Sequence, residues 1–165
     1  MHACIPNVSD FSLDSLDNPA WEKAALLPLS RTATGDLPYA TEARVLYSST
    51  GLYFRYECED RRLSCTFRED FEDLFKEDVI EIFLWPDESD DSYIEYELSP
   101  LDYELPLLVT NHEGSFHGWL PWKYHGERRC RHATAVRGGE KKPGSMVTGW
   151  KAGVFIPFEI GRAHV

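Results

Sequence analysis

The sequence predicts an all-β protein: an antiparallel β-sandwich of jelly-roll or immunoglobulin-like architecture with a short N-terminal helix. Three observations favour this fold class. Short stretches with strand-like alternation recur at close spacing, turn residues separate them, and almost no segment has a helical period. The 165 residues suit one domain with a sizeable core. We expect a loose lead-in over residues 1–12 and a single domain over residues 13–165.

The first element is expected in "LDSLDNPAWEKAALLPL". Asp17 or Asn18 offers an N-terminal cap, Pro19 stands in the first turn, and Trp21 is an apolar anchor. Pro28 cannot continue a helix because it has no backbone N–H. The stretch therefore predicts a helix of one or two turns that ends before Pro28.

Strands are expected from Arg44 onward. "ARVLYSS" and "LYFRYECED" flank a turn at Thr50–Gly51, and the second stretch alternates strictly between apolar and polar positions. The acidic stretch "REDFEDLFKED" predicts a loop with one helical turn, and "NHEGSFHGWLPWKYHGE" is rich in turn residues. The remaining predicted strands are "DVIEIFLW", "YIEYELS", "YELPLLVT", "RRCRHATAVRG" and "GWKAGVFIPF".

The hairpin "KEDVIEIFLWPDESDDSYIEYELSP" carries three carboxylates on one face. If its strands pair around residues 86–92, Glu81 lies opposite Glu97, and Glu95 is a diagonal neighbour. Like charges opposed on a sheet destabilise it by roughly 0.2–1 kcal/mol. We therefore expect a compensating partner: a cation, the guanidinium of Arg55, or a sugar whose hydroxyls donate hydrogen bonds.

Two other interpretations of this face stay open. Glutamate is common on a solvated outer sheet face, which needs no ligand. Two acids on adjacent strands are also the arrangement of a glycoside hydrolase, whose activity chromogenic glycosides would reveal.

The net charge and the hydropathy of the chain limit the classes of partner that it is expected to bind. The net charge of −11 disfavours nucleic acid and anionic membranes, and no apolar run reaches membrane-spanning length. The opening "MHACIPNVSD" lacks a basic stretch followed by an apolar one, so no signal peptide is expected. The chain is expected to be soluble, cytoplasmic as written and extracellular if a leader has been removed.

No cofactor or metal site is assigned from the sequence. The four cysteines contain no CxxC pair, and both a Cys58–Cys65 bridge and free thiols stay open. His112, His117 and His125 have spacings that fit no zinc pattern. The loop "PDESDDS" raises calcium as a candidate cofactor, although it lacks the glycine and distal glutamate of an EF-hand.

Several stretches together resemble the family 9 carbohydrate-binding modules and their DOMON-like sandwich relatives. "LDSLDNPAW" is similar to the family's opening element, and "ARVLYSSTGLYFRYECED" to its first pair of strands, closing at Asp60. The hairpin "KEDVIEIFLWPDESDDSYIEYELSP" matches the D-x-x-E-i-F-l element and the strand after it. "GWKAGVFIPF" resembles the strand that ends in IPF, so the likeness covers Leu13 to Phe158.

This resemblance implies a β-sandwich that binds a sugar without cleaving it, often at the end of a plant polysaccharide chain. In the family the sugar lies between two aromatic walls and accepts or donates hydrogen bonds at the conserved hairpin. The residues so implied are Glu81, Glu95 and Glu97 as hydrogen-bonding groups and Phe75 as the first wall. For the second wall, which relatives take from a later segment, we expect Trp119, Trp122 and Tyr124 to substitute by folding over the pocket; the alternative is that these rings plug the end of the sandwich.

The sequence also departs from the family pattern. Phe75 stands where Trp is expected, Gly153 where Glu is usual, and Glu97 where the best-known sugar binders have a basic residue. The chain ends at "EIGRAHV", whereas relatives continue into a further segment. We therefore expect an unpaired sheet edge and self-association. The alternative function is a structural or protein-interaction sandwich that has lost sugar binding.

Overall fold

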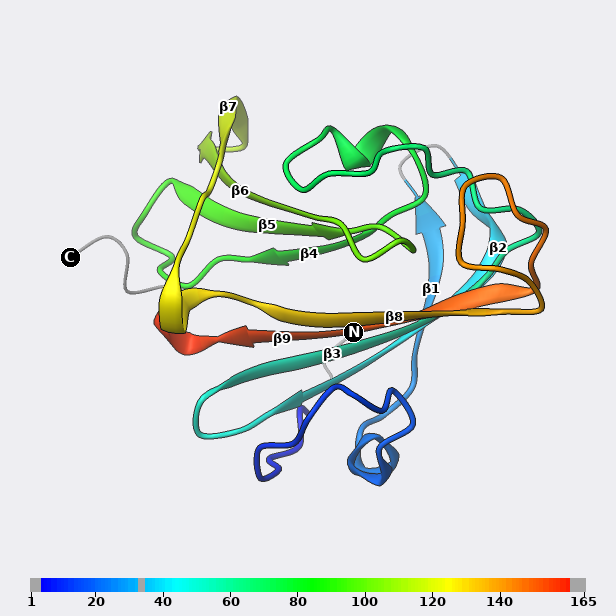
Figure 1. Cartoon of the computed structure of the whole chain (residues 1–165). Helices are drawn as coiled ribbons and strands as arrows, with labels where there is room; N and C mark the ends of the chain where they lie inside the picture. The colour runs from blue at the N-terminus through cyan, green and yellow to red at the C-terminus, as the bar shows by residue number, and fades with distance from the viewer. Residues whose placement is uncertain (1–3, 33–34, 161–165) are drawn as a thin grey trace.

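The computed structural model describes residues 4–32 and 35–160, and it confirms the predicted antiparallel sandwich of two sheets (Figure 1). The five-stranded sheet has the order β1-β2-β3-β9-β8, and the four-stranded sheet has the order β4-β5-β6-β7. The strands are β1 (Leu27–Thr32), β2 (Gly35–Tyr47), β3 (Gly51–Glu59), β4 (Ile80–Leu84), β5 (Ser92–Leu98), β6 (Glu104–His112), β7 (Ser115–Pro121), β8 (Arg131–Arg137) and β9 (Gly149–Pro157).

The main core lies between the two sheets, as the alternation of each strand predicts. On β3, Phe54 and Tyr56 point inward, and on β4 Ile80 and Ile82 do so. Strand β9 is buried along most of its length because it lies inside its sheet, between β3 and β8. The inward residues thus leave the alternate positions of each strand for the two outer faces.

A polar network crosses this core and joins the two sheets. The carboxylate of Glu104 on β6 accepts hydrogen bonds from the hydroxyls of Tyr96 and Tyr124, each at 2.8 Å. His132 on β8 lies 2.8 Å from the Tyr96 hydroxyl and 3.4 Å from the Glu104 carboxylate. Glu104 is only 2% exposed, so these bonds replace the water that the carboxylate loses on folding.

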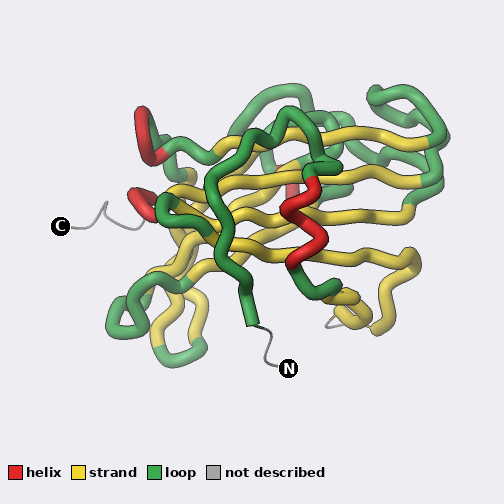
Figure 2. The backbone as a smooth tube through the Cα atoms, turned by 90° about the horizontal axis from the view of Figure 1, so that it is seen from below, coloured by secondary structure: helices red, strands yellow, loops and turns green. Residues whose placement is uncertain are grey.

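The N-terminal segment covers the outer face of the five-stranded sheet (Figure 2). Val8 and Trp21 are buried there against Tyr53 and Phe155 of the sheet. The backbone N–H of Val8 donates to the carbonyl of Tyr47 at 2.9 Å. Part of the predicted lead-in is therefore packed against the domain rather than loose.

The predicted short helix is a 3-10 helix, η1 (Pro19–Lys23). The Asn18 side chain accepts a hydrogen bond from the backbone N–H of Ala20 at 2.9 Å, as its role as a cap requires. The helix ends before Ala24, and Pro28 instead lies in strand β1. Proline fits this strand because β1 is at the edge of its sheet, where one row of N–H groups has no partner.

A second strand was also missed by the sequence pattern, because "SFHGWLP" lies in the stretch expected to be turns. It forms β7 at the edge of the four-stranded sheet, and most of its side chains are exposed. Gly114 and Gly118 have positive φ, and the register shifts between Thr110 and Asn111. An exposed, irregular edge strand has no regular apolar alternation, so the sequence of β7 is more typical of turns than of a strand.

The acidic stretch between β3 and β4 folds over the outer face of the four-stranded sheet. It contains the predicted helical turn, η2 (Leu74–Lys76). Leu74 packs against Leu105 and Leu107 of β6. The backbone N–H of Phe71 donates to the carbonyl of Glu104 at 3.0 Å. These contacts fix η2 next to the exposed face of β4 and β5.

Two further features concern the cysteines and the helices. All four cysteines are free thiols, so the bridge between Cys58 and Cys65 is not formed. A third short 3-10 helix, η3 (Gly126–Arg128), precedes β8. Within residues 4–32 and 35–160, no helix has the length and hydropathy needed to cross a membrane.

Candidate functional site

Three carboxylates converge on the outer face of the four-stranded sheet. Strands β4 and β5 pair in the expected register, with Glu81 directly opposite Glu97 and Phe83 opposite Glu95. One carboxylate oxygen from each glutamate lies within 4.8 Å of the others. The local reason is the strand period of two, because the apolar neighbours of these residues face the core and leave the acids outside.

The three acids differ in burial. Glu97 is 0% exposed, and neither of its carboxylate oxygens has a hydrogen bond of normal geometry, although the backbone N–H of Phe75 is close enough to lower its pKa. Glu81 and Glu95 are only partly buried. Among the described residues, none of the three forms an ion pair with a lysine or arginine. The face therefore concentrates negative charge without a protein cation to balance it.

Burial and mutual repulsion change the acidity of this cluster. Burial, followed by the charges of Glu95 and Glu81, raises the pKa of Glu97 to about 8. Burial and then the Glu81 charge raise the pKa of Glu95 to about 6. Burial alone raises the pKa of Glu81. Each shift has the direction expected when a carboxylate loses water without gaining a cation.

Aromatic rings frame the carboxylates. Phe75 of η2 and Trp119 of β7 approach edge to face, with ring centroids 6.3 Å apart. The two residues are 44 positions apart in the sequence, so no local pattern predicts their contact. They are 41% and 39% exposed, so both rings retain surface that a ligand can cover. In Figure 1, η2 lies on the side of the four-stranded sheet that faces away from the five-stranded sheet. The structure thus brings together five of the seven predicted site residues.

Two more aromatic residues share this face and are absent from the sequence-based set. Phe83, on β4, is 56% exposed and lies directly opposite Glu95. Its ring centroid is 6.0 Å from that of Tyr93 on β5. The signal that could have found them is strand alternation, because Phe83 and Tyr93 lie two residues from Glu81 and Glu95 along the same strands.

Of two large hollows, one borders this face and the other lies away from it. A groove of about 570 Å³ runs along the edge of β4, and Glu81, Phe83, Tyr39 and Trp150 contribute to its lining. A larger cavity of about 800 Å³ lies near β9 and η3 and shares no lining residue with the carboxylate face. The candidate site is therefore an open platform with a groove at one side.

Trp122 lies elsewhere in the structure. It packs against the core between the sheets, and its ring meets that of Tyr124 at a centroid distance of 5.9 Å. Its backbone N–H donates to the carbonyl of Pro106 at 2.7 Å. Trp122 follows the end of β7 at Pro121, whereas Trp119 lies within that strand. The structure does not place Trp122 beside the carboxylates.

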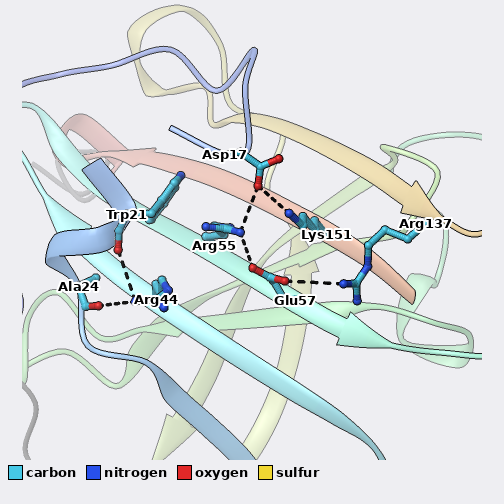
Figure 3. Close-up of polar contacts among 8 residues, drawn as sticks. All are labelled: Asp17, Trp21, Ala24, Arg44, Arg55, Glu57, Arg137 and Lys151. Carbon is cyan, nitrogen blue, oxygen red and sulfur yellow. Dashed lines mark hydrogen bonds and ion pairs between the residues drawn. The ribbon is translucent and has the colours of Figure 1, made fainter. Parts of the chain in front are cut away.

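The proposal that Arg55 compensates the carboxylates is wrong. Arg55 lies on β3 and faces the N-terminal segment (Figure 3). Because Arg55 is on the outer face of the five-stranded sheet and Glu81 on the outer face of the four-stranded sheet, the two lie on opposite sides of the sandwich. Its guanidinium binds Glu57 and also contacts Asp17 at 3.3 Å. Lys151 reaches the same Asp17 carboxylate at 2.6 Å. Arg55 therefore anchors the N-terminal segment to the five-stranded sheet.

Gly153, the other departure on this side, has a packing reason. It lies on β9 between Arg55 and Ala133, on the face that the N-terminal segment covers. A Cβ at this position would lie 2.5 Å from the Leu16 side chain and 3.3 Å from that of Leu13. The absence of a glutamate here therefore accommodates the N-terminal segment and does not alter the carboxylate face.

Comparisons with known proteins place these observations in context. The model of the carbohydrate family 9 binding domain-like family matches residues 13–116, more than half of the chain. No curated protein matches the sequence.

Two solved structures have a similar fold. A putative carbohydrate-binding protein from Bacteroides uniformis ATCC 8492 is 11% identical, with a TM-score of 0.73 over 98% of this chain and 74% of that one. A family 9 carbohydrate-binding module from Caldicellulosiruptor kristjanssonii, solved in complex with cellotriose, is 13% identical, with a TM-score of 0.62 over 93% of this chain and 65% of that one. At these identities the likeness concerns the fold, whereas the family match concerns the sequence itself. The chain belongs to the carbohydrate family 9 binding domain-like family.

Proposed function

We propose that the outer face of the four-stranded sheet binds a carbohydrate without cleaving it. The observation that carries this proposal is the convergence of three carboxylates beside the exposed rings of Phe75 and Trp119. Carboxylates accept hydrogen bonds from adjacent sugar hydroxyls, and aromatic rings cover the apolar face of a pyranose. Membership of the family supports the same function.

Each predicted site residue has a defined role in this proposal. Glu81 is the most accessible acceptor, because it lies on the edge strand beside the groove. Glu95 lies on the neighbouring strand β5, directly opposite Phe83. Phe75 and Trp119 supply stacking surface, and Phe83 extends that surface toward β4. The proposed ligand is an oligosaccharide or the end of a polysaccharide chain, and cellotriose is the first compound to test because the similar module was solved with it.

Binding without hydrolysis agrees with the direction from which the acids approach. A glycoside hydrolase holds its scissile bond between two carboxyl groups that flank it. Here all three carboxylates rise from one sheet surface, and Glu97 is completely buried. A sugar lying on this platform would have carboxylates on one side only, so we propose a binding module rather than an enzyme.

The test is isothermal titration of the protein with cellotriose and a panel of other oligosaccharides. Glu81→Gln and Phe75→Ala should each weaken binding by about tenfold, because each removes about 1.4 kcal/mol of hydrogen bonding or stacking. Phe158→Ala is the matched control for Phe75→Ala, because Phe158 is similarly exposed at 45% but follows β9 in the other sheet. It should leave the affinity unchanged.

Trp122→Ala separates the two tryptophans. We expect it to lower the free energy of unfolding, because it removes a ring packed on the core, and to leave the affinity of the folded protein unchanged. Trp119→Ala should weaken sugar binding and leave the free energy of unfolding nearly unchanged. If no oligosaccharide binds, or if Phe158→Ala weakens binding as much as Phe75→Ala, the platform is not the binding site. A panel without any binder would favour the interaction domain that has lost sugar binding.

The four-stranded sheet has two edge strands, β4 and β7, and the edge at β4 supports a further part of the proposal, self-association. Among the described strands, β4 has a hydrogen-bonded neighbour on one side only, which is β5. An unpaired edge offers backbone N–H and C=O groups to a second chain. Light scattering at rising protein concentration should show a dimer. A monomer at every concentration would contradict this prediction.

A further inference from the structure

We propose that Glu81, Glu95 and Glu97 together hold a calcium ion on the outer face of the four-stranded sheet. This site is distinct from the acidic loop "PDESDDS", which the sequence raised for calcium. The inference goes beyond the proposed function, because a cation can occupy the three carboxylates whether or not a sugar is bound.

The spacing of the carboxylates suits a metal ion. Calcium binds oxygen at about 2.3–2.6 Å, so two of its ligand atoms lie at most about 5 Å apart. One oxygen from each of the three glutamates satisfies this limit, because all three lie within 4.8 Å of one another. The pairing of β4 with β5 sets this spacing, since it places Glu81 directly opposite Glu97.

The state of Glu97 is a second, independent observation that points to a ligand. Its side chain is completely buried, and neither carboxylate oxygen has a hydrogen bond of normal geometry; among the described residues, the backbone N–H of Phe75 is the one protein donor close enough to lower its pKa. Burying a carboxyl group without a good partner is costly whether the group is charged or neutral, so such groups are normally hydrogen-bonded, paired or bound to a metal. The one nearby lysine that meets the ring of Phe75, Lys76, already pairs with Asp73 at 2.5 Å.

The donor atoms favour calcium over other common ions. The three side chains supply only carboxylate oxygens, and together they can provide up to six, whereas calcium takes six to eight oxygen ligands. Zinc and copper sites draw on histidine or cysteine, and no such residue joins this cluster among the described residues. Magnesium requires a nearly ideal octahedron, which side chains fixed on two paired strands do not readily form.

The position of the ion would also serve recognition, and this part rests on the proposed function. Glu97 lies at the closed side of the cluster, whereas Glu81 is partly exposed beside the groove. The remaining coordination positions would therefore face solvent near Phe75 and Trp119. Two neighbouring hydroxyls of a sugar could take these positions while its ring stacks on the aromatic side chains.

The experiment is a titration of the chelator-treated, full-length protein with calcium chloride, followed by calorimetry at constant ionic strength and without sugar. We expect one ion per chain, a higher Tm in calcium than in chelator, and weaker binding of magnesium. Glu97→Gln should weaken calcium binding at least tenfold. The matched control is Glu88→Gln, which removes an exposed acid of the "PDESDDS" loop and should leave calcium binding unchanged.

Two results would overturn the calcium site. One is the absence of calcium binding by the unmodified protein, and the other is a loss of binding in Glu88→Gln with none in Glu97→Gln. A thermal unfolding transition of Glu97→Gln in chelator shows that this variant is folded, so its loss of calcium binding is specific to the site.

Sugar titrations with and without calcium separate this inference from the proposed function. Calcium binding that depends on Glu97 supports the metal site even if no sugar binds. Sugar affinity that falls at least tenfold in chelator supports the bridging role. An equal sugar affinity in calcium and chelator overturns that bridging role and leaves carbohydrate binding intact.

Discussion

Replacing Glu104 by alanine should destabilise the fold by about 3–5 kcal/mol, the range measured when one partner of a buried charged pair is removed. The Glu104 carboxylate is the common acceptor for Tyr96 and Tyr124, and it lies 3.4 Å from His132 on the other sheet. The variant would leave two buried hydroxyls and an imidazole without this partner. Urea unfolding followed by circular dichroism measures the loss.

The protonation of this network sets the pH at which the effect is largest. Burial raises the pKa of Glu104, but hydrogen bonds from His132, Tyr96 and Tyr124 outweigh it, so the pKa is lowered overall. Burial lowers the pKa of His132, but its bond to Glu104 outweighs that effect and the pKa is raised. Both His132 nitrogens also face oxygens, of the Tyr96 hydroxyl and the Asp102 carbonyl, which suits the charged imidazolium.

The directions of these two pKa shifts define the pH range in which the network stabilises the fold most. A lowered carboxyl pKa stabilises the fold above the ordinary value of 4.5, and this contribution is lost as the pH falls through the folded pKa. A raised histidine pKa stabilises it below the ordinary value of 6.5, and this contribution is lost as the pH rises through the folded pKa. Glu104→Ala should therefore cost most between about pH 4.5 and 6.5.

Glu104→Gln and Glu88→Ala complete this experiment. Glutamine keeps an acceptor oxygen but no charge, so its cost should be smaller than that of alanine and should change less with pH. Glu88 is exposed in the hairpin loop, and its replacement should change stability by less than about 0.5 kcal/mol. A Glu104→Ala protein as stable as Glu88→Ala would show that the network contributes nothing to the fold.

Replacing Glu97 by glutamine should have the opposite effect and stabilise the protein in alkaline solution. Burial and the charges of Glu95 and Glu81 raise the pKa of Glu97 to about 8 in the folded state, against an ordinary value of 4.5. For a raised pKa, the contribution to stability is complete below 4.5 and is lost as the pH rises through 8. The unmodified protein should therefore lose stability across this range, by up to about 5 kcal/mol without solvent screening and by roughly 2–4 kcal/mol once screening is allowed for.

The measurement is the free energy of unfolding of both proteins from pH 4.5 to 9, with a chelator present to remove divalent ions. The Glu97→Gln protein should match the unmodified one at the acidic end and exceed it at the alkaline end. Glu88→Gln controls for the general effect of removing one negative charge. A difference between Glu97→Gln and the unmodified protein that stays constant with pH would contradict the proposed titration.

The hairpin was predictable because its information is local. The strand period places Glu81, Glu95 and Glu97 on one face, and the short loop sets their register, so the observed pairing of Glu81 with Glu97 follows from the sequence. The N-terminal cap at Asn18 is predictable for the same reason. Strands β1 and β7 were not predicted, because edge strands tolerate proline, glycine and exposed side chains and therefore lack a clear apolar alternation.

The outer face on which each site residue lies was harder to predict than the hairpin. Arg55 and Glu81 are both outward residues of alternating strands, and no local pattern indicates that they lie on opposite outer faces. The contact of Phe75 with Trp119 joins a loop to an edge strand, and it depends on how the acidic stretch folds over β6. Trp122 follows β7 and packs on the core, whereas Trp119 lies within that exposed edge strand, and no local pattern indicates this difference.

The fold class, the pairing of the central hairpin and the likeness to the family follow from the sequence alone, because each rests on strand alternation or on short motifs. Only the tertiary structure decides which outer face each strand presents and which rings stand beside the three acids. Those relations join residues far apart in the chain, and they depend on how the two sheets and the loop between β3 and β4 pack together.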